Sequence, residues 1–99
     1  MFRGTTPTLV FTLPFEASIF TDAYVTLAQD GTTVLEKALC DCSAEGNTLS
    51  VTLTQEETLL LQCRCRVDIQ IRGKLADGTT LASHTISTTV HRILKEGVI

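Results

Sequence analysis

The sequence predicts an all-β fold: an immunoglobulin-like antiparallel β-sandwich with one short helix between the fourth and fifth strands. Segments in which apolar and polar residues alternate recur along the chain and are separated by turn-forming residues. Only one segment carries the signals of a helix start, whereas a parallel α/β sheet needs a helix after nearly every strand. A chain of 99 residues is long enough for one modest core, so we expect residues 1–99 to form a single domain.

Four short alternating segments come first, at residues 8–13, 24–29, 33–39 and 48–53. Pro14 ends the first of them, because proline cannot donate a hydrogen bond to a sheet ladder. The second and third segments flank Asp30-Gly31, which is a hairpin signal. We expect a three-residue loop there, with Gly31 in the left-handed region, because that register pairs Val25 with Leu35 rather than with a charged residue.

A single short helix is expected after the fourth strand. The segment from Thr54 to Glu57 has the form of a capping box, in which each of these two side chains bonds the backbone N–H of the other residue. A leucine-rich segment follows to about Gln62, which predicts roughly two helical turns.

The strongest pattern is a hairpin of two long alternating segments, residues 64–75 and 81–90, on either side of Asp77-Gly78. With Asp77 and Gly78 at the centre of a two-residue turn, the pairing places most apolar side chains on one face. The residues predicted to pair on that inward face are Ile71 with His84, Ile69 with Ile86, Val67 with Thr88 and Cys65 with Val90. Cys65 and His84 are therefore expected to be shielded from solvent.

The outward row of this hairpin is polar and is the candidate contact face. It consists of Arg64, Arg66, Asp68, Gln70 and Arg72. Asp68 interrupts the arginines and the formal net charge of the chain is −3, so we interpret the row as a solvated sheet face rather than a basic stripe for nucleic acid.

The last segment, residues 91–99, mixes apolar side chains with charges. It either adds an edge strand or lies free, and its apolar end suggests a docking tail for its own domain or for a neighbour. The chain contains no apolar run long enough to cross a membrane and nothing resembling a signal peptide. We therefore expect no membrane partner and a protein that stays in the cytoplasm of the cell that makes it or enters an assembly built there.

Four cysteines form two Cys-x-Cys pairs, Cys40 with Cys42 and Cys63 with Cys65. Residues two apart in a strand share a face, so the four thiolates would be able to converge on zinc, although structural zinc sites usually use a wider spacing. A disulfide is a second interpretation, disfavoured in a reducing compartment. The third, which we prefer, is that free cysteines fill small buried positions, particularly Cys65 opposite Val90. We accordingly predict no metal and no cofactor.

No catalytic constellation is predicted. His84 is expected on the apolar face and His91 begins the tail, and neither has the neighbours of a triad. Asp30 and Asp77 have the character of turn formers. We therefore expect a protein that is not an enzyme and has no catalytic residues.

Several segments resemble the N-terminal domain of phage baseplate upper proteins, an immunoglobulin-like β-sandwich. They are residues 3–8 followed by 11–14, then 45–48 and 53–58, and the hairpin from 69–72 to 77–78. These segments are turns and caps rather than reactive groups. Baseplate upper proteins continue into further domains, whereas this sequence ends at Ile99.

The resemblance implies a bacteriophage or prophage structural protein of Gram-positive bacteria, a stand-alone adaptor of the virion, tail or baseplate. Such a protein would act through protein-protein contacts with other virion proteins or with copies of itself, as a homo-oligomer. It would lie in the cytoplasm of the bacterial host during assembly and then in the virion. The alternative is a small ligand- or carbohydrate-binding β-sandwich module, although the chain has no tryptophan and one tyrosine.

Overall fold

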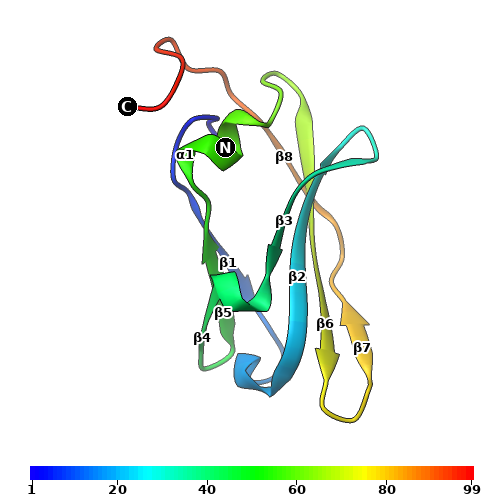
Figure 1. The fold of residues 1–99 in the computed structure, drawn as a ribbon. Coiled ribbons are helices and arrows are strands. Elements are labelled where there is room, and N and C mark those ends of the chain that lie inside the picture. The colour runs from blue at the N-terminus through cyan, green and yellow to red at the C-terminus, as the bar shows by residue number, and fades with distance from the viewer.

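A computed structural model describes residues 1–99 as two antiparallel sheets packed face to face, which confirms the predicted all-β sandwich (Figure 1). One sheet contains β1 (Thr8–Thr12), β4 (Cys42–Glu45) and β5 (Thr48–Thr52). The other contains β2 (Phe20–Gln29), β3 (Thr32–Ala38), β6 (Arg66–Leu75), β7 (Thr80–Ala82) and β8 (Ile86–Thr89). The helical elements are α1 (Gln55–Leu59) and two 3₁₀ turns, Ala17–Ile19 and Leu39–Asp41.

The strand order is β1-β5-β4 in one sheet and β3-β2-β6-β7 in the other, with β8 also pairing with β6. This order corresponds to strands B-E-D and C′-C-F-G of an immunoglobulin sandwich. In that fold strand A lies beside strand B. No strand of this sandwich takes that place, so β1 pairs with β5 alone and its other edge is free.

All six predicted strands exist, but one further strand was missed and one predicted strand is divided. The strand β4 was missed because Cys42–Glu45 shows no apolar alternation and lies mostly at the surface. The single strand expected over residues 81–90 is divided into β7 and β8, with no strand at Ser83–Thr85. Both errors occur in edge strands, where few side chains are buried and the alternation of apolar and polar residues is therefore weak.

The first hairpin has a shorter loop than expected. Gln29 pairs with Thr32, so the loop is the two residues Asp30 and Gly31, both with positive φ (51° and 75°). This is the type I′ geometry that follows the natural twist of the strands. A bulge at Val34 then shifts the register by one residue.

That bulge returns the apolar side chain of Leu35 to the core-facing side of β3. Beyond it Leu27 pairs with Leu35 and Val25 pairs with Lys37, so the expected pairing of Val25 with Leu35 was wrong. Leu27 and Leu35 are both buried. The extra residue allows a two-residue loop to coexist with an apolar inner face.

The second hairpin has a longer loop than expected. The Leu75 N–H donates to the Thr79 carbonyl at 2.8 Å, and the Gly78 N–H donates to the Leu75 carbonyl at 3.0 Å. Gly78 has a φ of 88°, so the loop is Ala76–Gly78. Near the loop the register therefore differs by one residue from the prediction, and the backbone N–H of Ser83 bonds the carbonyl of Ile71. The expected pairing of Ile71 with His84 was wrong.

The predicted register is recovered further along. Ile69 pairs with Ile86, and Val67 pairs with Thr88, as expected. The N–H of Val90 also bonds the carbonyl of Cys65 at 2.9 Å. One extra residue at Ser83–Thr85 accounts for the change of register between the two parts of the strand.

The predicted capping box begins α1. Thr54 Oγ1 accepts from the Glu57 backbone N–H at 3.2 Å, and Glu57 Oε1 accepts from the Thr54 N–H at 2.8 Å. The helix is shorter than predicted, ending at Leu59. None of the helices has the length and apolar composition that crossing a membrane requires.

The core lies between the sheets and is formed by alternate residues of the central strands. Val25 and Leu27 on β2, Leu49 on β5 and Val67 on β6 are fully buried. Burying each such side chain contributes about 1.5–3 kcal/mol of transfer free energy. One end of the sandwich is closed by buried polar contacts, because Gln29 exchanges two hydrogen bonds with the backbone of Gln62.

The tail forms no strand beyond a single bridge between His91 and Phe2. It folds back over its own domain, where the side chain of Gln55 bonds the backbone of Ile99 and Glu96 forms an ion pair with Arg3. Leu94 and Ile99 remain 90% exposed. The tail therefore docks through these polar contacts and the half-buried Ile93, and leaves Leu94 and Ile99 in water.

Candidate functional site

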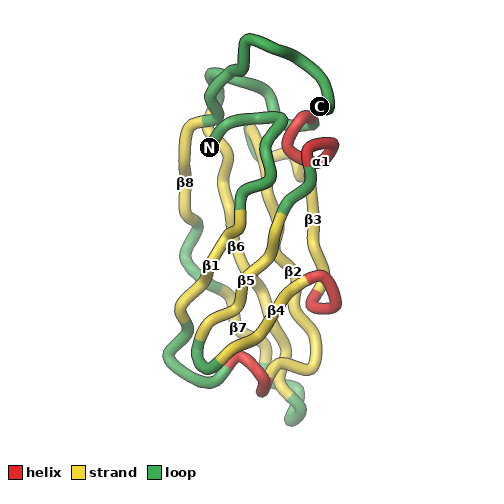
Figure 2. The backbone as a smooth tube through the Cα atoms, turned by 90° about the vertical axis from the view of Figure 1, so that its left-hand side faces the viewer, coloured by secondary structure: helices red, strands yellow, loops and turns green.

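The two long sides of the sandwich differ. On the first, the closed side, β3 and β4 are joined directly by the 3₁₀ turn Leu39–Asp41. On the second, the open side, β1 faces β7 and β8 across the gap between the sheets. Figure 2 shows β1 and β8 on one side of the molecule and β3 and β4 on the other.

The closed side is held by an ion pair. Lys37 Nζ on β3 donates to Glu57 Oε2 on α1 at 2.7 Å, and both side chains are mostly buried. The hydrogen bond raises the pKa of Lys37 above its ordinary 10.5, against a smaller lowering by burial. Burial raises the pKa of Glu57, but the bonds from Lys37 and Thr54 together bring it below its ordinary 4.5. Each shift stabilises the charged form of its group, and the pair ties β3 to α1.

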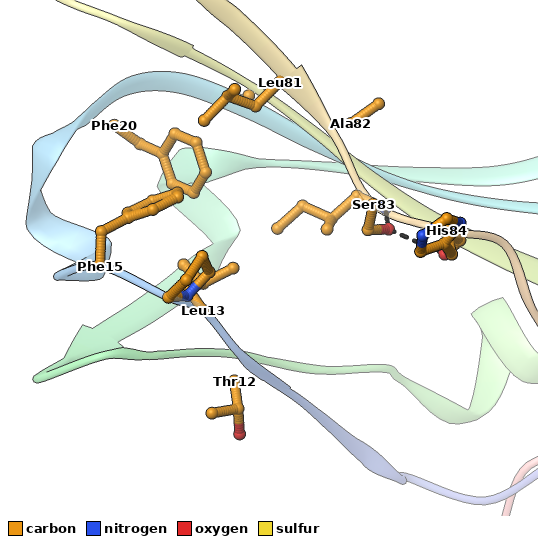
Figure 3. A pocket seen from close by; sticks show the side chains of 11 residues that line it. Thr12, Leu13, Phe15, Phe20, Leu81, Ala82, Ser83 and His84 are labelled. Atoms are coloured by element: carbon orange, nitrogen blue, oxygen red, sulfur yellow. Dashed lines mark hydrogen bonds between the residues drawn. The ribbon is translucent and has the colours of Figure 1, made fainter.

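The open side contains an apolar cavity of about 390 Å³, a size typical of small-ligand pockets. Its main apolar residues are Leu13, Phe15, Phe20, Ile71 and Leu81. In Figure 3 the side chains of Leu13, Phe15 and Phe20 group at one end, and Ser83 and His84 lie at the other.

Two aromatic rings shape the wall of this cavity. Phe15 and Phe20 pack edge to face with their centroids 5.4 Å apart. The ring of Phe20 also lies directly over Gly73 on β6, where an added Cβ would stand 2.1 Å from its Cε1 atom. Gly73 is therefore required by the position of the ring and not by a turn.

The interruption between β7 and β8 forms the rim of the cavity. Ser83 is half-buried, and its Oγ accepts from the Ile71 N–H at 3.1 Å and donates to the His84 carbonyl at 3.0 Å. The side chain of His84 is exposed, so the prediction that it points into the core was wrong. The extra residue in the strand is the physical reason, because it reverses the side-chain direction at this position.

The free edge of β1 completes the open side. Leu13 donates to the Asn47 carbonyl at 2.8 Å, and the Pro7 carbonyl accepts from Leu53 at 2.9 Å, so odd-numbered residues direct their backbone groups toward β5. By alternation along a strand, the N–H and C=O groups of even-numbered residues point away from β5. These outward groups belong to Thr8, Val10 and Thr12, and no second strand lies on that side of β1 to bond them.

The predicted contact face is separate from the open side. Arg66, Asp68, Gln70 and Arg72 share the outer face of β6, as the strand parity predicted, with Asp68 half-buried and the others exposed. Arg64 precedes the strand and has a φ of 63°. It is exposed but lies outside β6, so the expected start of this strand at residue 64 was wrong.

The cysteine pairs lie on different elements. Cys40 and Cys42 flank the end of the 3₁₀ turn on the closed side, and Cys63 and Cys65 precede β6. All four are free, and no three Cys, His, Asp or Glu side chains gather in a metal-binding arrangement. Cys65 is half-buried rather than fully shielded. Burial raises the pKa of the Cys42 thiol, with a further rise from Asp41, which disfavours its reactive thiolate form.

The chain matches no family model, no curated protein and no solved structure in the comparisons made. The open side was not identified from the sequence. A five-residue strand without charges between Pro7 and Pro14 was the available signal for a free edge. The cavity had no such signal, because it depends on how Phe15 and Phe20 meet a strand more than 50 residues later in the chain.

Proposed function

We propose that this chain is a structural adaptor of a phage or prophage particle that works through protein-protein contacts. The single observation that carries the proposal is the free, uncharged edge of β1 on the open side. Unpaired strand edges template the addition of another strand, and natural proteins usually protect them with charges, proline or a covering segment. The resemblance of the sequence to baseplate upper proteins supplies the phage context.

The apolar surface of the tail supports the same proposal. Leu94 and Ile99 are almost fully exposed, and Ile86 on β8 is 54% exposed. Covering such side chains with a partner removes apolar surface from water, which stabilises the complex. These side chains would contact neighbouring virion proteins as the particle assembles in the host cytoplasm, and would stay covered in the finished virion.

The test is composition of the particle. Phage induced from the cell that encodes the chain would be purified, and its proteins quantified by mass spectrometry. We expect the chain in the purified particles at a fixed copy number relative to tail proteins. A chain that is expressed during induction but absent from the particles would refute the proposal.

The cavity of the open side favours a second candidate, a module that binds an apolar small ligand. Its walls are apolar and its volume is adequate. Binding of a fluorescent apolar probe would test it: saturable binding with one site per chain, lost in Ala82→Trp, supports a ligand site. Carbohydrate binding has less support, because Tyr24 is the one aromatic ring on the outer strand faces.

A further inference from the structure

We infer that two copies of this chain associate by pairing their β1 strands antiparallel about Val10, which joins two three-stranded sheets into one continuous sheet. The inference rests on the proposed function and names the partner that fits the free edge. It places the second copy where the immunoglobulin fold has strand A.

The backbone groups of β1 suit this pairing. Antiparallel partners exchange hydrogen bonds only between residues whose N–H and C=O groups both point toward the partner. On the free edge of β1 those residues are the even-numbered ones, because Pro7 and Leu13 direct theirs to β5. Even-numbered residues must therefore face even-numbered residues of the second copy.

A two-fold axis through Val10 satisfies that condition. Val10 then lies opposite Val10 of the second copy, and Thr8 lies opposite Thr12, so that every outward N–H and C=O of the strand finds a partner. The prolines at positions 7 and 14 bracket the strand. They limit the paired segment to its five residues and hold the register against sliding.

The other strand edges are less suited to a second copy. The edge strand β3 contains Glu36 and Lys37, and β4 ends at Glu45. Charges of this kind protect an edge from pairing. The remaining edge is interrupted between β7 and β8, and Met1 occupies its end by bonding the backbone of Thr89. The strand β1 contains no charged residue, so two copies meet there without opposing like charges.

Pairing would also bury the exposed side chain of Val10. It is 61% exposed on the outer face of the sheet, where its neighbours across the pair are Thr and Ser residues. In the two-fold pair each Val10 packs against the other as a direct cross-strand neighbour. A five-residue strand extends about 17 Å. Pairing along that length buries less surface than the ~800 Å² per partner of a stable complex. The pair should therefore be weak in dilute solution and populated at the high local concentration of an assembly.

The first experiment measures association of the whole chain. Sedimentation equilibrium over a wide concentration range should show a monomer-dimer equilibrium. Val10→Lys places two ammonium groups opposite each other and should raise the dissociation constant about tenfold or more. Val10→Pro should do the same by removing the outward N–H, a change that an edge strand tolerates. Ser43→Lys is the matched control, because Ser43 is exposed on β4 in the same sheet, and it should leave the dissociation constant unchanged.

The second experiment tests the register. In a Cys40→Ser background, which removes the one exposed thiol, Val10→Cys should form a disulfide-linked dimer on mild oxidation. Directly opposed hydrogen-bonded residues have Cα atoms about 5.5 Å apart, within the range a disulfide spans. Thr8→Cys should not form a linked dimer, because Thr8 faces Thr12, whereas the double change Thr8→Cys and Thr12→Cys should.

The outcomes separate this inference from the proposed function. Equal dissociation constants for the native chain, Val10→Lys and Ser43→Lys, or linked dimers from Thr8→Cys but not Val10→Cys, would overturn the β1 pairing. Neither result would affect the presence of the chain in purified particles, which decides the proposed function independently.

Discussion

The closed and open sides of the sandwich show two ways of ending a pair of sheets. On the closed side the chain itself crosses between the sheets, and Lys37 and Glu57 add an ion pair that is mostly buried. On the open side the sheets are joined only near their ends, and an apolar cavity lies between them. The closed side is completed within one chain, whereas the open side leaves backbone groups and apolar surface for another molecule.

The difference also separates stability from function. Groups on the closed side satisfy each other, so their removal should lower the free energy of unfolding. Groups on the free edge of β1 have no partner in the chain, so their removal should change association and leave the fold intact. Regions of low local stability are commonly those that bind.

The largest expected effect compares two leucines on edge strands of the same sheet. Leu35 on β3 is 8% exposed on the closed side, and Leu81 on β7 is 37% exposed beside the cavity. Leu35→Ala should lower the free energy of unfolding by about 2–4 kcal/mol, since it removes a buried side chain and leaves a void. Leu81→Ala should cost less than about 1 kcal/mol, because its side chain is already partly in water.

Urea denaturation measures the free energy of unfolding of both leucine variants. The two are compared at the same dependence of that free energy on urea concentration. Equal losses of stability for the two would contradict the distinction between the sides. A larger loss for Leu81→Ala would reverse it, and would mean that the open side is packed as firmly as the closed one.

The next effect concerns the wall of the cavity. Gly73→Ala would place a methyl group against the ring of Phe20, 2.1 Å from its Cε1 atom, and the ring has to move toward the cavity. We expect a destabilisation of about 1–3 kcal/mol from this overpacking. Adding Phe20→Leu should recover part of the loss, because the smaller side chain accommodates the methyl group, and a double-mutant cycle measures that coupling. Strictly additive effects would show that Gly73 and Phe20 do not constrain each other.

The sequence predicted the parts of the fold that depend on local pattern. Strand parity placed Ile69 and Val67 inside, and the Thr54 capping box marked the helix start. Both hairpin loops were predicted with the wrong length, since an Asp-Gly pair serves two- and three-residue loops alike. Extra residues at Val34 and at Ser83–Thr85 compensate for these loop lengths and bring the register back further along each hairpin.

The candidate site was less accessible to sequence reasoning than the fold. The predicted row on β6 is real from Arg66 to Arg72, yet it lies on a sheet face whose residues alternate in any sandwich. The open side is created by segments from both ends of the chain, Thr12 to Phe15 and Leu81 to His84. Contacts between residues so far apart in the chain produce no local pattern of apolar and polar residues that a single sequence would show.

The smallest expected effect is the pH dependence of the closed side. The pKa of Glu57 lies below its ordinary 4.5 in the folded chain, so its contribution to stability is present above pH 4.5 and is lost as the pH falls through the folded value. The pKa of Lys37 is raised above 10.5, so its contribution is present below pH 10.5 and is lost at higher pH. Between these limits Glu57→Gln should lower the free energy of unfolding by about 1 kcal/mol.

Glutamine keeps the capping box, so the loss reports the ion pair. Urea denaturation of the native chain and Glu57→Gln should show their difference at pH 7 shrinking as the pH falls below 4.5 and through the folded pKa of Glu57, where the native side chain loses its charge. Glu56→Gln is the control, since Glu56 lies in the same helical turn but is exposed and forms no ion pair. A difference for Glu57→Gln that persists undiminished after Glu57 is protonated would mean that the charge of Glu57 does not cause the loss. A loss that Glu56→Gln reproduces at pH 7 would mean that helix electrostatics rather than the Lys37 contact holds the closed side.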